Sequence, residues 1–94
     1  MRNKFDLIWS PELLKQIKLI QKTKSESDQS NYFNKIEHLI KIIAESPFHG
    51  IGKPEHLKHE VPPCWSRKIN KKDRLIYRVK EKTIEIVSII GHYE

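Results

Sequence analysis

The chain has 94 residues, of which 37% are hydrophobic and 32% charged, and it carries a formal net charge of +6. This length allows one domain with a small core, and the apolar content argues against disorder. The basic charge favours a polyanionic partner, such as nucleic acid, an acidic protein or an anionic membrane. The single cysteine, Cys64, excludes an internal disulfide and any multi-cysteine zinc site. No stretch approaches the roughly 20 apolar residues that a membrane span needs, and the N-terminal residues lack the uninterrupted apolar core of a signal peptide. We therefore expect a cytoplasmic protein without membrane association.

The first half of the chain predicts a strand followed by two helices. "KFDLIW", residues 4–9, is typical of a short strand. Ser10 can cap a helix that starts at Pro11, where proline loses no useful hydrogen-bond donor. We expect residues 25–30, "SESDQS", to be a polar connector, and a second amphipathic helix to end before Pro47.

The second half is rich in β-branched and aromatic residues, which indicates strands over residues 64–70, 74–80 and 83–93. The connectors between them are short and predict an antiparallel meander, with residues 56–61 as a further edge strand. Two amphipathic helices need a sheet face to bury against. We therefore predict a single α+β domain over residues 1–94, with two N-terminal helices on one face of a mainly antiparallel sheet and the other face left open.

Alternation along the strands predicts which side chains share a face. Arg74, Ile76 and Arg78 should lie opposite Leu75, Tyr77 and Val79. On the preceding strand, one face should carry Trp65, Arg67 and Ile69, and the other Ser66 and Lys68. On the last strand, one set is Ile84, Ile86, Ser88, Ile90 and His92. Tyr93 would then point away from His92, unless the strand ends or bulges near Gly91.

Arginines beside aromatic rings on a sheet face suit RNA, because the cations hold phosphate and the rings stack on unpaired bases. The same pattern also fits solvated strand residues with no ligand. Both interpretations stay open on the residues alone.

The loop "GIGKPEHLKHEV", residues 50–61, allows three interpretations: a linker, a metal clip through His56 and His59, or part of an acid–base site. The histidine spacing suits zinc only on a helix or with a third ligand, and Gly52 and Pro54 disfavour a helix. Metal-free RNA cleavage needs a base for the 2′-hydroxyl, an acid for the departing 5′-oxygen, and cations for the phosphorane. Glutamate, histidine and arginine can supply these roles.

Several strings together resemble the YoeB/Txe toxins of the RelE/ParE toxin–antitoxin superfamily. They are "LIWSPE", "SPFHGIGKPEHLKH", "WSRKINKKDRLIYRV" and the terminal "HY", and they run in order along essentially the whole chain. The resemblance implies a microbial-RNase-like fold and a ribosome-dependent endoribonuclease that cleaves mRNA in the A site without a metal or other cofactor. It also implies a YefM/Axe-like antitoxin that blocks the toxin, and an operator DNA bound only by the toxin–antitoxin complex. A homodimer stays open.

The resemblance also assigns residue roles by motif. It makes Glu55 the general base, Arg74 the stabiliser of the phosphate and His92 the general acid. Tyr93 would position the RNA or the phosphate. The motifs further imply RNA or phosphate contacts for Lys58, Arg67, Lys68 and Trp65.

This chain departs from the family pattern in three places. His49 and Ile51 stand where the family often has charged residues, and Lys68 stands where arginine is common. Glu94 follows the terminal His-Tyr pair and adds a carboxylate near His92. A non-catalytic alternative also exists, because some superfamily members poison DNA gyrase. The presence of the Glu, Arg and His/Tyr set argues against that alternative.

Overall fold

The computed structural model describes residues 5–52, 54–57 and 64–91. The elements in chain order are β1 (Asp6–Trp9), α1 (Pro11–Thr23), α2 (Glu26–Glu45), β2 (Glu55–Leu57), β3 (Cys64–Lys68), β4 (Arg74–Lys80) and β5 (Thr83–Ile90). The described strands form one sheet in the order β1-β5-β4-β3-β2. β1 pairs with β5 in parallel, and the other pairs are antiparallel. The predicted α+β class and the mainly antiparallel sheet are confirmed.

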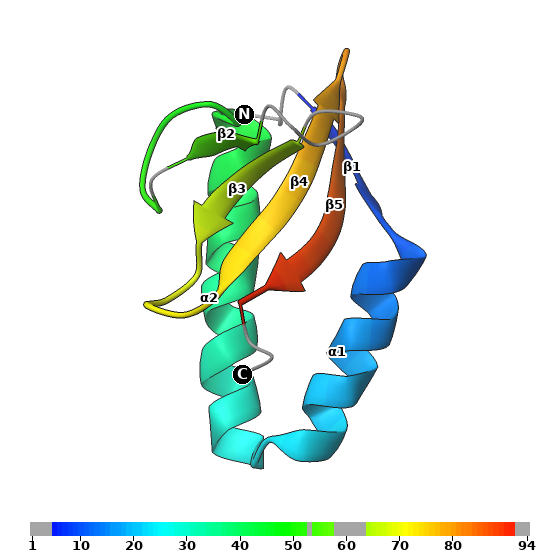
Figure 1. Ribbon diagram of the computed structural model, residues 1–94, viewed down its shortest axis with the longest axis vertical. Coiled ribbons are helices and arrows are strands. Elements are labelled where there is room, and N and C mark those ends of the chain that lie inside the picture. The colour runs from blue at the N-terminus through cyan, green and yellow to red at the C-terminus, as the bar shows by residue number, and fades with distance from the viewer. Residues whose placement is uncertain (1–4, 53, 58–63, 92–94) are drawn as a thin grey trace.

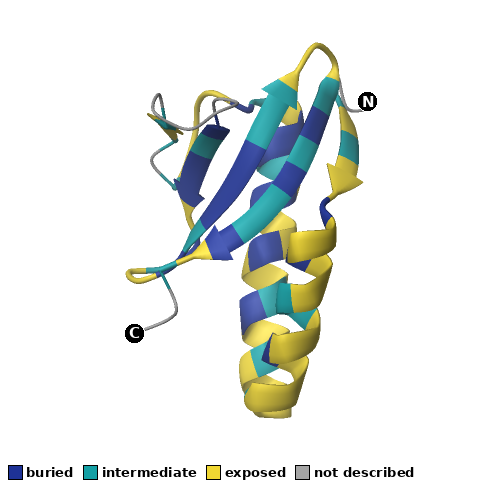
Figure 2. Cartoon of the chain, turned by 45° about the vertical axis from the view of Figure 1, so that its right-hand side comes forward, coloured by how far each residue is buried: buried dark blue, intermediate teal, exposed yellow. Residues whose placement is uncertain are grey.

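The two helices form a hairpin, and α2 runs behind the sheet in Figure 1. One face of the sheet carries the core side chains of the central strands, which pack with the apolar stripes of both helices. The buried cluster includes Leu13, Ile20, Tyr32, Ile36, Leu39, Ile40, Ile43, Ile69, Leu75, Tyr77, Ile84, Ile86 and Ile89. In Figure 2 the buried residues alternate with less buried ones along β5. The helices therefore cover one face, as the pattern predicts.

The start of α1 is confirmed in detail. The hydroxyl of Ser10 accepts a hydrogen bond from the backbone N–H of Leu13 at 3.0 Å, and Pro11 is the first helical residue. Ser10 is 6% exposed although it is polar. Its hydroxyl also donates to the carbonyl of Val87, and its own N–H donates to the carbonyl of Ile86 at 3.0 Å. Ser10 therefore caps the start of α1 and also links this helix to β5.

The connector predicted over residues 25–30 was wrong. Ser25 is the N-cap of α2, and its hydroxyl accepts from the N–H of Asp28 at 3.3 Å. Glu26 and Asp28 lie in the first turn, where negative charge favours the N-terminus of a helix. A segment rich in capping residues therefore became the first helical turn instead of a loop. The predicted end before Pro47 is confirmed, since α2 ends at Glu45.

The alternation predicted for the last strand was also wrong beyond Ile86. Tyr77 pairs with Ile86, but Ile76 pairs with Ser88, so Val87 is an extra residue in β5. This bulge reverses the two faces: Ile89 is 2% exposed in the core and Ile90 is 41% exposed. The strand ends at Ile90, and Gly91 follows with φ +96°. A Cβ at Gly91 would lie 2.1 Å from the carbonyl oxygen of Lys72, so this position needs glycine.

Within the described residues, no helix combines the length and the apolar character that crossing a membrane would require.

Candidate active site

The sheet face away from the helices carries the candidate site. Strand pairing places Glu55 of β2, Ser66 of β3, Ile76 of β4 and Ser88 of β5 in one row across the sheet. Directly opposite residues of adjacent strands share a face. The neighbouring row on the same face therefore holds Lys68, Arg74 and Ile90.

Glu55 and Arg74 come together on this open face. A guanidinium nitrogen of Arg74 lies 3.8 Å from a carboxylate oxygen of Glu55. The Glu55 side chain is 65% exposed, whereas that of Arg74 is 23% exposed. An exposed ion pair at this distance adds little to stability. The carboxylate is thus open to solvent and to a ligand.

Ser66 fixes the guanidinium of Arg74. Nε of Arg74 donates to the hydroxyl of Ser66 at 2.8 Å, and Nη2 donates to the carbonyl of Ser66 at 3.5 Å. Ser66 itself is 1% exposed. A buried hydroxyl holding Nε aims the outer end of the guanidinium along the open face. Sequence reasoning missed this role, although the alternation does place Ser66 on the face of Lys68 and Arg74.

Lys68 and Trp65 fall in different places. Lys68 ends β3, is exposed and pairs with Arg74, so it lies on the open face beside the candidate site. Trp65 has the opposite parity. Its ring stacks on His56 at 4.9 Å between centroids, and Phe48 packs on it at 4.9 Å. Trp65 therefore lies away from the Glu55–Arg74 face.

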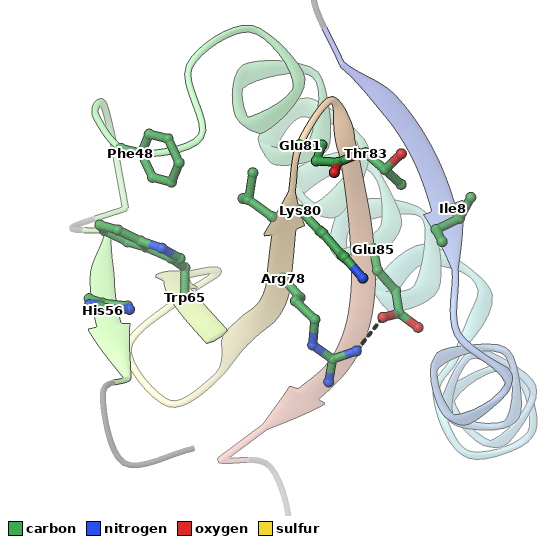
Figure 3. A pocket seen from close by; sticks show the side chains of 10 residues that line it. Ile8, Phe48, His56, Trp65, Arg78, Lys80, Glu81, Thr83 and Glu85 are labelled. Atoms are coloured by element: carbon green, nitrogen blue, oxygen red, sulfur yellow. Dashed lines mark hydrogen bonds and ion pairs between the residues drawn. The ribbon is translucent and has the colours of Figure 1, made fainter. Parts of the chain in front are cut away.

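A pocket of about 770 Å³ lies at the end of the sheet near the β4–β5 turn (Figure 3). The rings of Phe48, Trp65 and His56 line one side, and Arg78 and Lys80 lie across from them. Neither Glu55 nor Arg74 lines this pocket, so it is separate from the candidate site.

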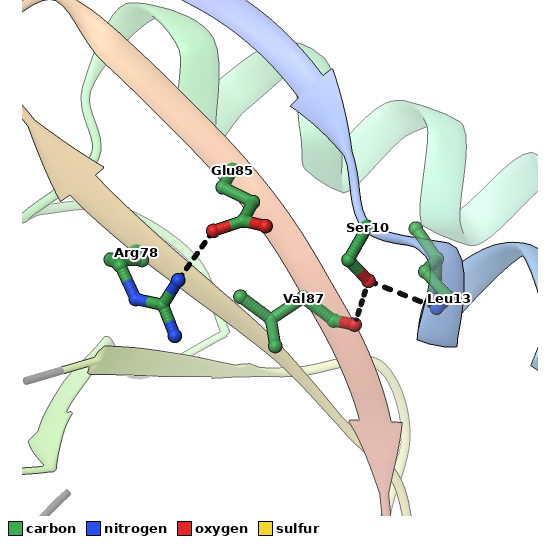
Figure 4. Close-up of polar contacts among 5 residues, drawn as sticks. All are labelled: Ser10, Leu13, Arg78, Glu85 and Val87. Carbon is green, nitrogen blue, oxygen red and sulfur yellow. Dashed lines mark hydrogen bonds and ion pairs between the residues drawn. The ribbon is translucent and has the colours of Figure 1, made fainter. Parts of the chain in front are cut away.

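Arg78 lies on the same face of the sheet as Arg74, but its charge is balanced by a carboxylate. It forms a 2.5 Å ion pair with Glu85, the residue directly opposite on β5 (Figure 4). Opposite charges on facing strands stabilise the sheet. This arrangement favours a structural role for Arg78 over a contact with phosphate.

The expectation that Arg67 contacts RNA disagrees with its position. Arg67 is 0% exposed. Its Nη2 donates to the carbonyl of Ser46 at 2.9 Å and to the hydroxyl of Tyr77 at 3.4 Å. A side chain with no exposed surface cannot reach a phosphate without leaving these partners. The alternation puts Arg67 on the same face as Trp65, and in the structure the helices cover that face.

Burial raises the pKa of the Tyr77 hydroxyl above its usual value near 10, and the hydrogen bond and charge of Arg67 partly oppose this rise. Tyr77 therefore stays neutral at physiological pH and donates to the carbonyl of Pro47.

The remaining predicted site residues, Lys58, His92 and Tyr93, lie outside the described residues, as does His59 of the alternative metal clip. In the described part of the chain, no group of three or more His, Cys, Asp or Glu side chains could hold a metal ion.

The comparisons with known proteins decide the family. Residues 9–93 match the family described as "YoeB-like toxin of bacterial type II toxin-antitoxin system". The chain belongs to the YoeB family. It is 38% identical to the toxin YoeB of Escherichia coli strain K12 over 87 residues, which cover 93% of this chain and 98% of that protein.

Solved YoeB structures share the fold. The YoeB/ParE toxin from Agrobacterium tumefaciens superposes with a TM-score of 0.77 at 31% identity, covering 95% of this chain and 100% of that one. The YoeB dimer from Staphylococcus aureus gives 0.75 at 33% identity, covering 96% and 99%. YoeB in a heterotetrameric YoeB–YefM complex from the same organism gives 0.74 at 33%, covering 95% and 98%. The YafQ toxin of E. coli, in its complex with DinJ, shares the fold at 19% identity, a TM-score of 0.73 and coverage of 94% and 93%.

Proposed function

We propose that this YoeB-family toxin is a metal-independent endoribonuclease that cleaves mRNA in the ribosomal A site and thereby inhibits translation. The observation that carries the proposal is the pair of Glu55 and Arg74 on the open sheet face, 3.8 Å apart, with the carboxylate 65% exposed. A base and a permanent cation within reach of one phosphate are what 2′-hydroxyl attack on phosphorus requires.

Glu55 is the base in this proposal. Its carboxylate takes the proton of the ribose 2′-hydroxyl as the 2′-oxygen attacks the adjacent phosphorus. The bond from phosphorus to the 5′-oxygen then breaks, which leaves a 2′,3′-cyclic phosphate on one fragment. His92 donates the proton that the departing 5′-oxygen needs, and Tyr93 helps to position the phosphate; both assignments rest on the family motif.

Arg74 stabilises the extra negative charge on the phosphorane. A guanidinium can donate to two phosphate oxygens at once and stays charged at every pH of interest. Because Ser66 already holds Nε, the side chain loses little freedom when phosphate binds. Lys68, which pairs with Arg74 on the same face, and Lys58 add positive charge for the RNA backbone.

We further propose a YefM-like antitoxin as the neutralising partner, because a YoeB relative from S. aureus is complexed with YefM. An antitoxin segment with acidic and apolar side chains would lie on the basic open face in place of RNA. Binding should weaken as salt rises if exposed charges dominate. The toxin–antitoxin complex, and not the toxin alone, would bind operator DNA. A homodimer, as named for the S. aureus relative, is testable by sedimentation.

The experiment is to map mRNA 5′ ends in bacterial cells that express the toxin. Wild type should produce new ends within coding sequences, at positions that follow the reading frame. The Glu55→Gln protein, if folded, should not produce them. Gyrase-linked DNA breaks without new mRNA ends would refute the proposal and favour the gyrase-poison alternative.

A further inference from the structure

We infer that Arg67 and Tyr77 act as positioning residues: together they hold the loop that delivers Glu55 to the open face. This inference rests on the proposed role of Glu55 as the base. Neither side chain reaches the open face, since both are 0% exposed under the helix-covered side of the sheet.

Arg67 is a tertiary cap for the C-terminus of α2. The last turn of α2 contains no basic residue, and its final carbonyl groups carry the negative end of the helix dipole. Arg67, from β3, donates through Nη2 to the carbonyl of Ser46, the C-cap residue of that helix. The guanidinium therefore supplies from another element the cation that the helix end lacks.

Tyr77 continues the same clamp by one residue. Its hydroxyl donates to the carbonyl of Pro47 and accepts from Nη2 of Arg67 at 3.4 Å. The guanidinium carbon also lies 5.8 Å from the centre of the Tyr77 ring, within the range of a cation–π contact. Two consecutive carbonyl groups, of Ser46 and Pro47, are thus fixed by two side chains of the sheet.

The loop after Pro47 wraps directly around Arg67. A Cβ at Gly52 would lie only 2.5 Å from Cγ of Arg67, and Gly52 has φ +86°. A Cβ at Gly50 would lie 3.4 Å from Nη1. The carbonyl of Gly52 accepts from the N–H of Lys68 at 2.6 Å, and Glu55 follows three residues later. The loop is therefore in close contact with Arg67 at Gly50 and Gly52 and is hydrogen-bonded to β3 at Lys68.

The buried cation is poorly satisfied by hydrogen bonds alone. Among the residues that the structure describes, Nε and Nη1 of Arg67 have no hydrogen-bond partner. Buried unsatisfied groups cost free energy and tend to persist where function needs them. A hydrophobic residue could fill the same space, but it could not fix the Ser46 carbonyl and set the path of the loop. The hydrogen bond to Ser46 and the close fit of the loop therefore account for an arginine at this position.

The test uses Tyr77→Phe, which removes one hydroxyl and keeps the ring. Its control is Ile20→Val, a core change on α1 remote from the loop. The two variants are compared at temperatures equally far below their own Tm values. In single-turnover cleavage on programmed ribosomes, Tyr77→Phe should lower the rate at saturating ribosomes by about 10–100-fold, as a small misplacement of a catalytic group does. The ribosome concentration at half-maximal rate should change less than about twofold, because ground-state binding is untouched.

Arg67→Lys keeps the charge but loses the fork geometry. The cleavage rate of Arg67→Lys at saturating ribosomes should be lower than that of wild type, as for Tyr77→Phe, and the rate of Arg67→Met should be lower still. If the rates of Tyr77→Phe and Ile20→Val agree within about twofold, the inference is wrong.

Hydrogen exchange separates this inference from the proposed function. The amide of Lys68, which donates to Gly52, should exchange faster in Tyr77→Phe than in Ile20→Val, whether or not the protein cleaves RNA. If wild type fails to cleave but this exchange difference appears, the clamp stands and the endoribonuclease proposal falls. If wild type cleaves and the exchange rates of the two variants are equal, the inference about Arg67 and Tyr77 is wrong and the endoribonuclease proposal is unaffected.

Discussion

The hydroxyl of Ser66 holds Nε of Arg74 at 2.8 Å, one strand away, and so fixes the cation that faces Glu55. We predict that Ser66→Ala lowers the cleavage rate by about tenfold, because Arg74 loses its orientation while keeping its charge. Arg74→Lys should lose about 10²–10³-fold, the usual cost of losing one oriented donor to a developing anion. Rates on programmed ribosomes measure both. Ser88→Ala is the matched control, because Ser88 lies in the same row of the sheet as Glu55 and Ser66 and loses the same hydroxyl group. This variant should cleave at the wild-type rate.

The side-chain amide of Gln16 acts as a partner for the backbone of Ile89. Its Nε2 donates to the Ile89 carbonyl at 2.9 Å, and its Oε1 accepts from the Ile89 N–H at 2.8 Å. Gln16→Ala should reduce the free energy of unfolding by about 1–3 kcal/mol, since a buried backbone pair loses its partner. Urea denaturation tests this. Gln21→Ala, at an exposed α1 position, should change it by less than about 0.5 kcal/mol; equal losses in the two variants would contradict the pairing.

The raised pKa of Tyr77 predicts a specific loss of stability at high pH. Burial holds the folded-state pKa above the unfolded value near 10. As the pH rises past 10, the unfolded chain loses its proton first, so the unfolded state is favoured. The contribution is fully present below pH 10 and falls between that value and the folded pKa. The difference in free energy of unfolding between wild type and Tyr77→Phe should therefore shrink as the pH rises from 8 to 11.

Denaturation at several pH values measures this difference. Ile20→Val, which removes no titratable group, provides the comparison and should follow the wild-type slope. A difference between wild type and Tyr77→Phe that is independent of pH would contradict the burial argument.

Gly52 should tolerate no side chain. A Cβ there would meet Cγ of Arg67 at 2.5 Å and the carbonyl of Lys68 at 3.0 Å, on a backbone with φ +86°. Gly52→Ala should therefore destabilise the protein by more than about 1 kcal/mol and also slow cleavage through the displaced loop. Thermal unfolding and cleavage rates check the two effects. Gly50→Ala has more room, with its nearest contact at 3.4 Å, and should lose less stability.

Much of the fold is readable from the sequence because its signals are local. Ser10 before Pro11 marks a helix start, Pro47 marks a helix end, and β-branched runs mark the strands. The segment 25–30 misled because Ser25 and Asp28 serve loops and helix caps equally well. In the structure Ser25 caps α2, and the helix already begins at Glu26.

The site is readable only in part. Glu55 and Arg74 lie on one face because two separate strands, β2 and β4, both align with β3, and sequence alternation alone does not give that alignment. At the bulge the carbonyl of Val87 accepts from the hydroxyl of Ser10, which is 77 residues away in sequence, and the strand pattern does not reveal such a long-range contact. Arg67 shares a face with Trp65 and Ile69 as predicted, but alternation gives a residue's face only relative to its neighbours, and it does not show that the helices cover this face.

The most direct test of the central claim is cleavage of an mRNA positioned in the A site of purified ribosomes, comparing wild type with Glu55→Gln and with Glu37→Gln. The control makes the same chemical change at an exposed position of α2. We predict that wild type and Glu37→Gln cut within the A-site codon at equal rates, and that Glu55→Gln is slower by about 10²–10⁴-fold. Cleavage by a folded Glu55→Gln protein at the wild-type rate would contradict the account.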